Sequence, residues 1–252
     1  MANWNDPQPT RPERSGFGVS PELGRAGGAA TTQVDAGLRR YMLSIYNYMA
    51  SGVLLSGVVA LLFAQSGMAA QMMHSSLFIV VALAPLGFVM AMSFGLNRMQ
   101  TSTLQALFWA FCTVMGLSLS TILLRYTGAS VATTFFATAG AFAGLSLVGY
   151  TTKRNLSAMG SFLIMGVWGI LIAMLLNAFV LHSSAMSLAI SVLGVLIFAG
   201  LTAYDTQRLK MMYYQVAGTD MAGKVVIMGA LSLYLDFINM FQFLLSFMGD
   251  RR

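Results

Sequence analysis

The stretch VVIMGALSLYLDFINMFQFLLSFM, from Val225 to Met248, decides the class of this protein. It is apolar over more than the roughly twenty residues that a helix needs to cross the hydrocarbon core of a bilayer. Asp236 lies near its middle and is its only charged residue. An aspartate at the centre of a transmembrane helix costs about 2.5–3.5 kcal/mol on insertion scales, so Asp236 is a candidate functional residue.

Two polar residues share the helical face of Asp236. Ser232 lies four residues before it and Asn239 three residues after it. Side chains at these spacings stack on one side of a helix, so the sequence predicts a narrow polar stripe that faces the interior of a helix bundle. A purely structural role is the alternative, in which a protonated Asp236 hydrogen-bonds to another helix.

Composition places the rest of the chain in the membrane as well. The 252 residues are 57% hydrophobic and only 9% charged, whereas soluble domains carry roughly 25% charged residues. Long apolar runs without ten-residue alternation predict an all-α integral membrane protein rather than a β-barrel. The net charge of +6 lies in short stretches between apolar runs, which suits membrane topology and gives no reason to expect a nucleic-acid partner.

Seven segments are long and apolar enough to span the bilayer, which is the expected lipid partner. We expect residues 1–37, which are polar and rich in Pro, Gly and Arg, to form a disordered tail without a signal peptide, and residues 38–252 to form the membrane domain. The predicted spans are Tyr41–Ala64, Leu77–Leu96, Leu104–Leu124, Val131–Tyr150, Ser157–Leu181, Ala185–Tyr204 and Val225–Met248. In the fourth of them, Gly140 and Gly144 match a small-residue pattern typical of helix packing.

The distribution of basic residues predicts a cytoplasmic N-terminus. With that orientation the outer side holds only Arg125, Arg251 and Arg252. The arginine pair at the C-terminus opposes an external C-terminus, because basic residues favour the cytoplasmic side. A cytoplasmic C-terminus would require six full spans with a re-entrant last segment. The cytoplasmic side holds Arg39, Arg40, Arg98, Lys153, Arg154, Arg208, Lys210 and Lys224.

Asp205 is a second carboxylate, at the predicted cytoplasmic end of the sixth span. Two adjacent carboxylates repel each other when both are ionised, so a pair of Asp205 and Asp236 favours a shared proton or a bound cation. Calcium takes six to eight oxygen ligands, and Asn239 or an interrupted helix end near Asp205 would add oxygens. The alternative for Asp205 is an ion pair with Arg208, three residues later.

Arg98 ends the second span on the same predicted side as Asp205. It is either a latch that neutralises this carboxylate or a marker of membrane topology. No motif of a hydrolase, nucleotide-binding enzyme or metalloprotease occurs in a suitable context, and the aspartates lack the Gly-x-Gly-Asp element of intramembrane aspartyl proteases. We therefore expect neither an enzyme nor a cofactor.

Three motifs stand out along the spans: ALSLYLDFIN at residues 230–239, AYDTQ at 203–207 and MGLSL at 115–119. They resemble motifs of the Bax inhibitor-1 family, also called the transmembrane Bax inhibitor motif family. The segments DAGLR at 35–39 and IYNYMA at 45–50 resemble the bacterial branch. The resemblance covers approximately residues 35–249.

This resemblance implies a bundle of seven helices with the last helix at its centre. It also implies a pH-sensitive calcium leak of a bacterial inner membrane, gated by the aspartates that match here Asp205 and Asp236, with Ca²⁺ and protons as ligands. The basic residue that pairs with the first aspartate in a closed state matches Arg98. Some bacterial members instead associate with a membrane-bound ATP-dependent protease, so an interaction protein that docks through its N-terminal tail is the second hypothesis.

Overall fold

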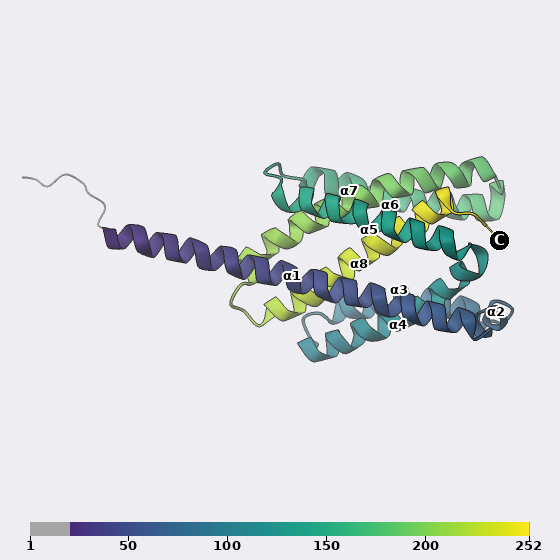
Figure 1. Ribbon diagram of the computed structural model, residues 1–252, viewed down its shortest axis with the longest axis horizontal. Helices are drawn as coiled ribbons and strands as arrows, with labels where there is room; N and C mark the ends of the chain where they lie inside the picture. Colours follow the sequence, from purple (N-terminus) through teal and green to yellow (C-terminus); the bar gives the residue numbers. More distant parts are fainter. Residues whose placement is uncertain (1–20, 252) are drawn as a thin grey trace, which may run out of the picture. The chain divides into compact units, whose positions relative to one another are not determined.

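The computed structural model describes the backbone of residues 21–251 and the side chains of residues 36–251 (Figure 1). Within this part of the chain the regular elements are helices, apart from one isolated bridge between Tyr126 and Arg251. The helices are α1 (Pro21–Gln65), α2 (Met68–Met73), α3 (Leu77–Gly95), α4 (Thr101–Arg125), α5 (Gly128–Thr151), α6 (Ser157–Leu176), the π-helical turn η1 (Asn177–Leu181), α7 (Ser184–Val216) and α8 (Met221–Met248).

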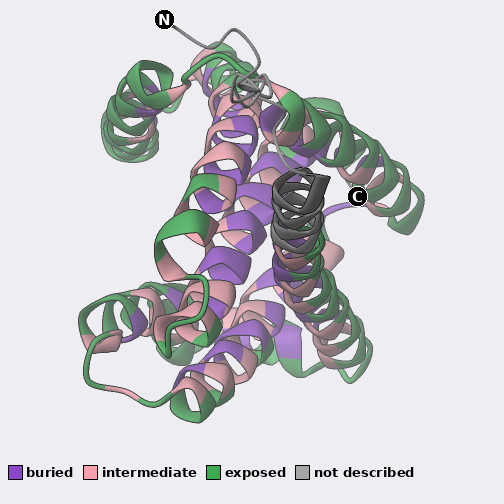
Figure 2. Ribbon diagram, turned by 90° about the vertical axis from the view of Figure 1, so that its left-hand side faces the viewer, coloured by how far each residue is buried: buried purple, intermediate pink, exposed green. Residues whose placement is uncertain are grey.

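The predicted seven-helix membrane fold is confirmed. Seven of the described helical segments are long and apolar enough to cross a bilayer, and each overlaps one predicted span. Large apolar side chains are exposed along these helices, as a lipid-facing surface requires. Figure 2 colours the exposed residues along the ribbon green and the buried residues purple.

The last helix is the most buried. Half of the apolar window of α8 is buried, compared with 11–33% for the other six spans. It packs on α7, α5 and α4. The position of α8 follows from its composition, because its small and aromatic residues, such as Ala230 and Tyr234, are fully enclosed by neighbouring helices.

Helix α7 is longer than the sequence predicts. It runs without interruption through Asp205 to Val216, so the expected break near Asp205 does not occur, and only residues 217–220 connect it to α8. Hydropathy falls after Tyr204, which marks the end of an apolar run rather than the end of a helix. The backbone carbonyls near Asp205 therefore lie within a continuous helix instead of at an open helix end.

Helix α1 also differs from the expectation. It begins at Pro21, within the segment 1–37 predicted to be disordered, while residues 1–20 lie outside the described part. Proline is favourable at the first position of a helix, and alanines follow it at positions 29 and 30. The chain forms two units, residues 1–39 and 40–252, and the second unit contains both Asp205 and Asp236.

The C-terminal end of α8 is fixed to the α4–α5 turn. The backbone N–H of Thr127 donates to the carbonyl of Asp250 at 3.1 Å, and the Asp250 N–H donates to Ser130 Oγ at 3.0 Å. The guanidinium of Arg251 lies 6.0 Å from the centre of the Tyr126 ring. These contacts give Arg251 a local role in the fold besides its charge.

Close helix packing involves other glycines than the predicted pair. A Cβ at Gly140 or Gly144 would meet no atom within 4 Å, so neither glycine makes a close helix contact among the described residues. By contrast, a Cβ at Gly149 would collide with the backbone of Ala203. This glycine lets α5 approach α7 two residues before Asp205.

Candidate functional site

Asp205 lies on the buried side of α7 and points to α8. The residue is 6% exposed. Ser232 Oγ donates to Asp205 Oδ2 at 2.7 Å, which joins the two helices through side chains. Ser232 is the polar residue one turn before Asp236, so this member of the predicted polar stripe faces α7.

Arg208 is the cation nearest to this carboxylate. Its Nη1 lies 3.6 Å from Asp205 Oδ1, and its Nη2 donates to Ser232 Oγ at 3.4 Å. The guanidinium also lies 5.8 Å from the centre of the Tyr204 ring. The ion pair named as the alternative for Asp205 is thus present, although it is long and the Arg208 side chain is 38% exposed.

Asp236 lies one helical turn further along α8 and is 5% exposed. Its Oδ2 is buried and has no hydrogen-bond partner among the described residues. Ser232, which bonds to Asp205, lies one helical turn before it on α8. A structural role as interhelical glue needs a hydrogen bond to another helix, and this oxygen makes none.

Arg98, the predicted latch, and Asn239, the predicted additional calcium ligand, lie outside this cluster of contacts. Arg98 is exposed, and the one ion pair within the described side chains joins Arg208 and Asp205. The structure therefore does not bring Arg98 to Asp205, and its latch role stays a prediction. Asn239 is half-buried on α8, and its role as a calcium ligand likewise stays a prediction.

Residues that follow Asp205 hold α7 against α5 and the α5–α6 turn. Thr206 Oγ1 donates to Ser146 Oγ at 3.4 Å. Gln207 Nε2 donates to the carbonyl of Arg154 at 2.7 Å, and its Oε1 accepts from the N–H of Leu156 at 2.9 Å. The motif AYDTQ thus directs one side chain to α8 and the next two to the α5–α6 hairpin, which fixes the rotation of α7.

A second polar cluster lies on another side of α8. Tyr234 Oη and Ser56 Oγ are 2.6 Å apart, and Ser56 Oγ is 2.7 Å from the carbonyl of Cys112 and 3.0 Å from that of Gly52. Ser56 has a single hydroxyl proton to donate to a carbonyl, so Tyr234 donates to Ser56. The cluster joins α1, α4 and α8 and is fully buried.

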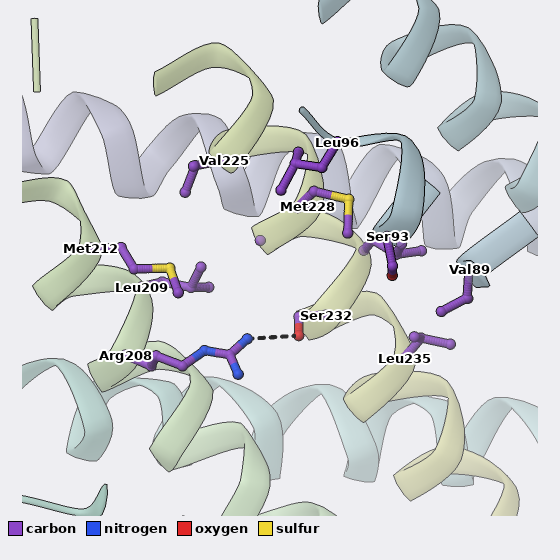
Figure 3. A pocket seen from close by; sticks show the side chains of 12 residues that line it. Val89, Ser93, Leu96, Arg208, Leu209, Met212, Val225, Met228, Ser232 and Leu235 are labelled. Atoms are coloured by element: carbon purple, nitrogen blue, oxygen red, sulfur yellow. Dashed lines mark hydrogen bonds between the residues drawn. The ribbon is translucent and has the colours of Figure 1, made fainter. Parts of the chain in front are cut away.

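A cavity of about 290 Å³ lies beside the first cluster, between α3, α7 and α8 (Figure 3). Arg208 and Ser232 form part of its wall, and their hydrogen bond is visible in the figure. The other lining residues are mostly apolar, including Val89, Met212 and Met228. Within the described residues no group of three or more His, Cys, Asp or Glu side chains is placed to hold a metal ion.

The sequence comparison identifies the family. A family model described as "Inhibitor of apoptosis-promoting Bax1" matches residues 38–252. The chain belongs to the Bax inhibitor-1 family. Its membership confirms the resemblance drawn from the motifs around Asp205 and Asp236.

Bacterial relatives of this Bax inhibitor-1 protein match it over most of their length. A protein of Caulobacter vibrioides is 50% identical over 237 residues, which cover 88% of this chain and 93% of the relative. A protein of Rickettsia prowazekii is 47% identical, over 86% and 92% of the two chains. The inner membrane protein YbhL of Escherichia coli is 42% identical, over 87% and 95%. The chain is thus a multi-pass membrane protein with bacterial relatives, one of them named for the inner membrane.

Two features of the site are not predicted by the sequence. Ser232 lies on the predicted face, but its direct bond to Asp205 depends on how α7 and α8 pack. The second feature is the bonding of Gln207 to the α5–α6 turn, for which the sequence gives no signal beyond the place of this residue in the motif AYDTQ. By contrast, the spacing of three residues between Asp205 and Arg208 does give a signal, because such residues are neighbours on a helix.

Proposed function

We propose that this protein is a passive, pH-sensitive calcium leak of a bacterial inner membrane, with Asp205 and Asp236 as its ion-binding and proton-binding groups. The observation that carries the proposal is the buried Asp236 Oδ2, which has no hydrogen-bond partner in the described structure. A buried carboxyl oxygen without a partner is expensive to maintain. It is therefore a candidate for a group that binds a proton or a cation during function.

The cluster supplies oxygen ligands of the kind that calcium prefers. Asp205 and Asp236 provide carboxylates and Ser232 a hydroxyl, with Asn239 one turn further along α8. Calcium takes six to eight oxygens, so water would complete its coordination. A site with so few protein ligands suits an ion that passes through rather than one that is stored.

Arg208 controls whether a cation can bind to Asp205. With its guanidinium beside Asp205, the positive charge occupies the place that an incoming cation would take. We infer that calcium entry requires Arg208 to move away from Asp205. Protons and Ca²⁺ compete for the same oxygens, so calcium binding weakens as the pH falls and the carboxyl groups become protonated.

The experiment is calcium flux into liposomes that contain the purified protein and a calcium dye. We expect Asp205→Asn and Asp236→Asn each to reduce the flux by about tenfold or more. The matched control is Asp220→Asn, which removes an exposed carboxylate just before α8 and should leave the flux unchanged. Unchanged flux and pH dependence in both site variants would show that the mechanism is wrong.

The proposed orientation has a cytoplasmic N-terminus and, after seven spans, an external C-terminus. The support is the excess of basic residues on one side of the predicted spans. A green fluorescent protein fused after Arg252 should therefore stay dark in cells, because it does not fold outside the cytoplasm when exported unfolded. A bright fusion would reverse this orientation or reduce the number of full spans to six.

The second hypothesis, modulation of a membrane-bound ATP-dependent protease, assigns the main role to the N-terminal tail. Deletion of residues 1–36 separates the two functions. A leak through the helix bundle should survive this deletion, because Asp205, Asp236 and the side chains that bond to Asp205 lie in α7 and α8, outside the deleted segment. Loss of co-purification with a protease after the deletion, with flux retained, would support the interaction role as a separate activity.

A further inference from the structure

The cavity between α3, α7 and α8 has a composition that differs from an ion pathway. Its wall is mainly apolar, with Val89 from α3, Leu96 just after α3, and Met228 and Leu235 from α8. Helix α3 packs chiefly on α4, so the cavity fills the space left between α3 and the α7–α8 pair. An apolar wall of this kind suits a hydrocarbon chain better than a hydrated cation.

Arg208 is the one ionisable residue among those that line this cavity. Two of its nitrogens face Asp205 and Ser232, but its buried Nε has no hydrogen-bond partner among the described residues. That nitrogen is enclosed by protein, but a guanidinium has five N–H donors and the two interactions of its terminal nitrogens are long, so donors remain at the cavity wall for an acidic ligand. The ammonium group of Lys224, whose Nζ donates to the carbonyl of Leu96 at 3.2 Å, adds positive charge at the α3 end nearby.

The size and layout of the cavity favour a ligand with one chain and one negative charge. Its volume of about 290 Å³ lies at the lower limit of the range of about 300–1,000 Å³ for small-molecule sites, which is small for a lipid with two chains. A guanidinium forms its strongest hydrogen bonds with carboxylates and phosphates. Leu235 lies one turn beyond Ser232 on α8, farther from the start of this helix at Met221. A hydrocarbon chain whose head group lies at Arg208 therefore meets apolar wall deeper in the membrane.

We propose that this cavity binds a long-chain fatty acid, with its carboxylate on the guanidinium of Arg208 and its chain against the apolar wall formed by α3 and α8. The fatty acid comes from the surrounding bilayer. The cavity shares Arg208 with the proposed calcium site, but fatty-acid binding can be measured without any ion flux, so its failure is distinguishable from failure of the calcium leak.

The test is photolabelling of the purified full-length protein in detergent with palmitic acid that carries a diazirine in its chain. The reaction is run at a mildly alkaline pH at which the carboxylate is ionised, and labelled peptides are identified by mass spectrometry. We expect labels to concentrate on the segments 89–96 and 225–235. Unlabelled palmitic acid should displace the label about tenfold better than hexadecanol, which has the same chain without the charge.

Two variants separate the head group from the chain. Arg208→Gln should weaken displacement by palmitic acid about tenfold, whereas Arg98→Gln, which removes an exposed arginine, should leave it unchanged. Met228→Trp fills the cavity and should abolish labelling while Arg208 is retained. The proposal is overturned if hexadecanol competes as well as palmitic acid, or if Met228→Trp is labelled like the parent protein. It is also overturned if the label spreads evenly over all lipid-facing helices.

Discussion

Helix α8 carries two polar clusters that differ in how completely their hydrogen bonds are formed. Tyr234, Ser56 and the carbonyl of Cys112 are neutral, fully buried and mutually paired. Asp205, Ser232, Arg208 and Asp236 are charged or polar and leave two buried atoms without partners, Asp236 Oδ2 and Arg208 Nε. A complete network stabilises a fold, whereas an incomplete one is retained at a cost and indicates function. Substitutions in the first cluster should therefore change stability, and substitutions in the second should change activity.

The largest expected effect on stability comes from the complete cluster. Tyr234→Ala removes a fully buried ring that packs edge-on against Phe108 and Phe111. Loss of a large buried aromatic side chain costs about 3–5 kcal/mol. Unfolding in detergent followed by circular dichroism should show this loss. A change below about 1 kcal/mol would mean that the neighbouring helices collapse into the space and that α8 is held elsewhere.

Ser56→Ala should have a smaller effect in the same cluster. It leaves the buried Tyr234 hydroxyl without its partner at 2.6 Å. An unsatisfied buried hydroxyl costs about 1–3 kcal/mol. The double variant Ser56→Ala with Tyr234→Phe removes both hydroxyls and should recover part of this loss. If the double variant is as unstable as the sum of the single ones, the two hydroxyls do not act as a pair.

Arg208→Gln should lower the free energy of unfolding by less than about 1 kcal/mol, since a long and partly exposed ion pair contributes little. The distance of 3.6 Å and the 38% exposure of the arginine side chain both limit its strength. The same variant should raise calcium flux, because Asp205 loses the cation that neutralises it. A large loss of stability with unchanged flux would show that Arg208, like Tyr234, stabilises the fold and does not control calcium flux.

Asp236→Asn should have the smallest effect on stability, within about 0.5 kcal/mol of the parent protein. The amide keeps the shape of the side chain, and the buried Oδ2 has no partner to lose. Thermal unfolding of the purified variant measures this directly, and the flux assay on the same sample reports activity. A clear destabilisation would show that the carboxyl group makes a contact essential to the fold, which would remove the contrast between the two clusters.

Much of the fold and part of the site could be predicted from the sequence. All seven spans follow from hydropathy, since the bilayer imposes a minimum apolar length. The polar stripe of Ser232 and Asp236 follows from helical periodicity alone. The continuation of α7 to Val216 is not signalled by hydropathy, which falls after Tyr204, and the bonds from Gln207 and Lys210 to the α5–α6 hairpin that accompany it depend on tertiary packing. The pairing of Asp205 with Arg208 could be predicted as an alternative from their spacing of three residues, whereas the exposed position of Arg98, beyond the end of α3, is set by tertiary packing.

The central position of α8 has a consequence for biosynthesis. Among the seven spans of the described residues, the most buried one leaves the ribosome after the other six, so those six enter the bilayer before the helix that fills their interior exists. Only residues 217–220 separate α8 from α7, which favours entry of the two as one antiparallel hairpin. Arg208 then enters beside Asp205, and its positive charge offsets part of the cost of taking that carboxylate into lipid. A chain that terminates before Met221 would present unfilled helix faces to the quality-control proteases of the membrane.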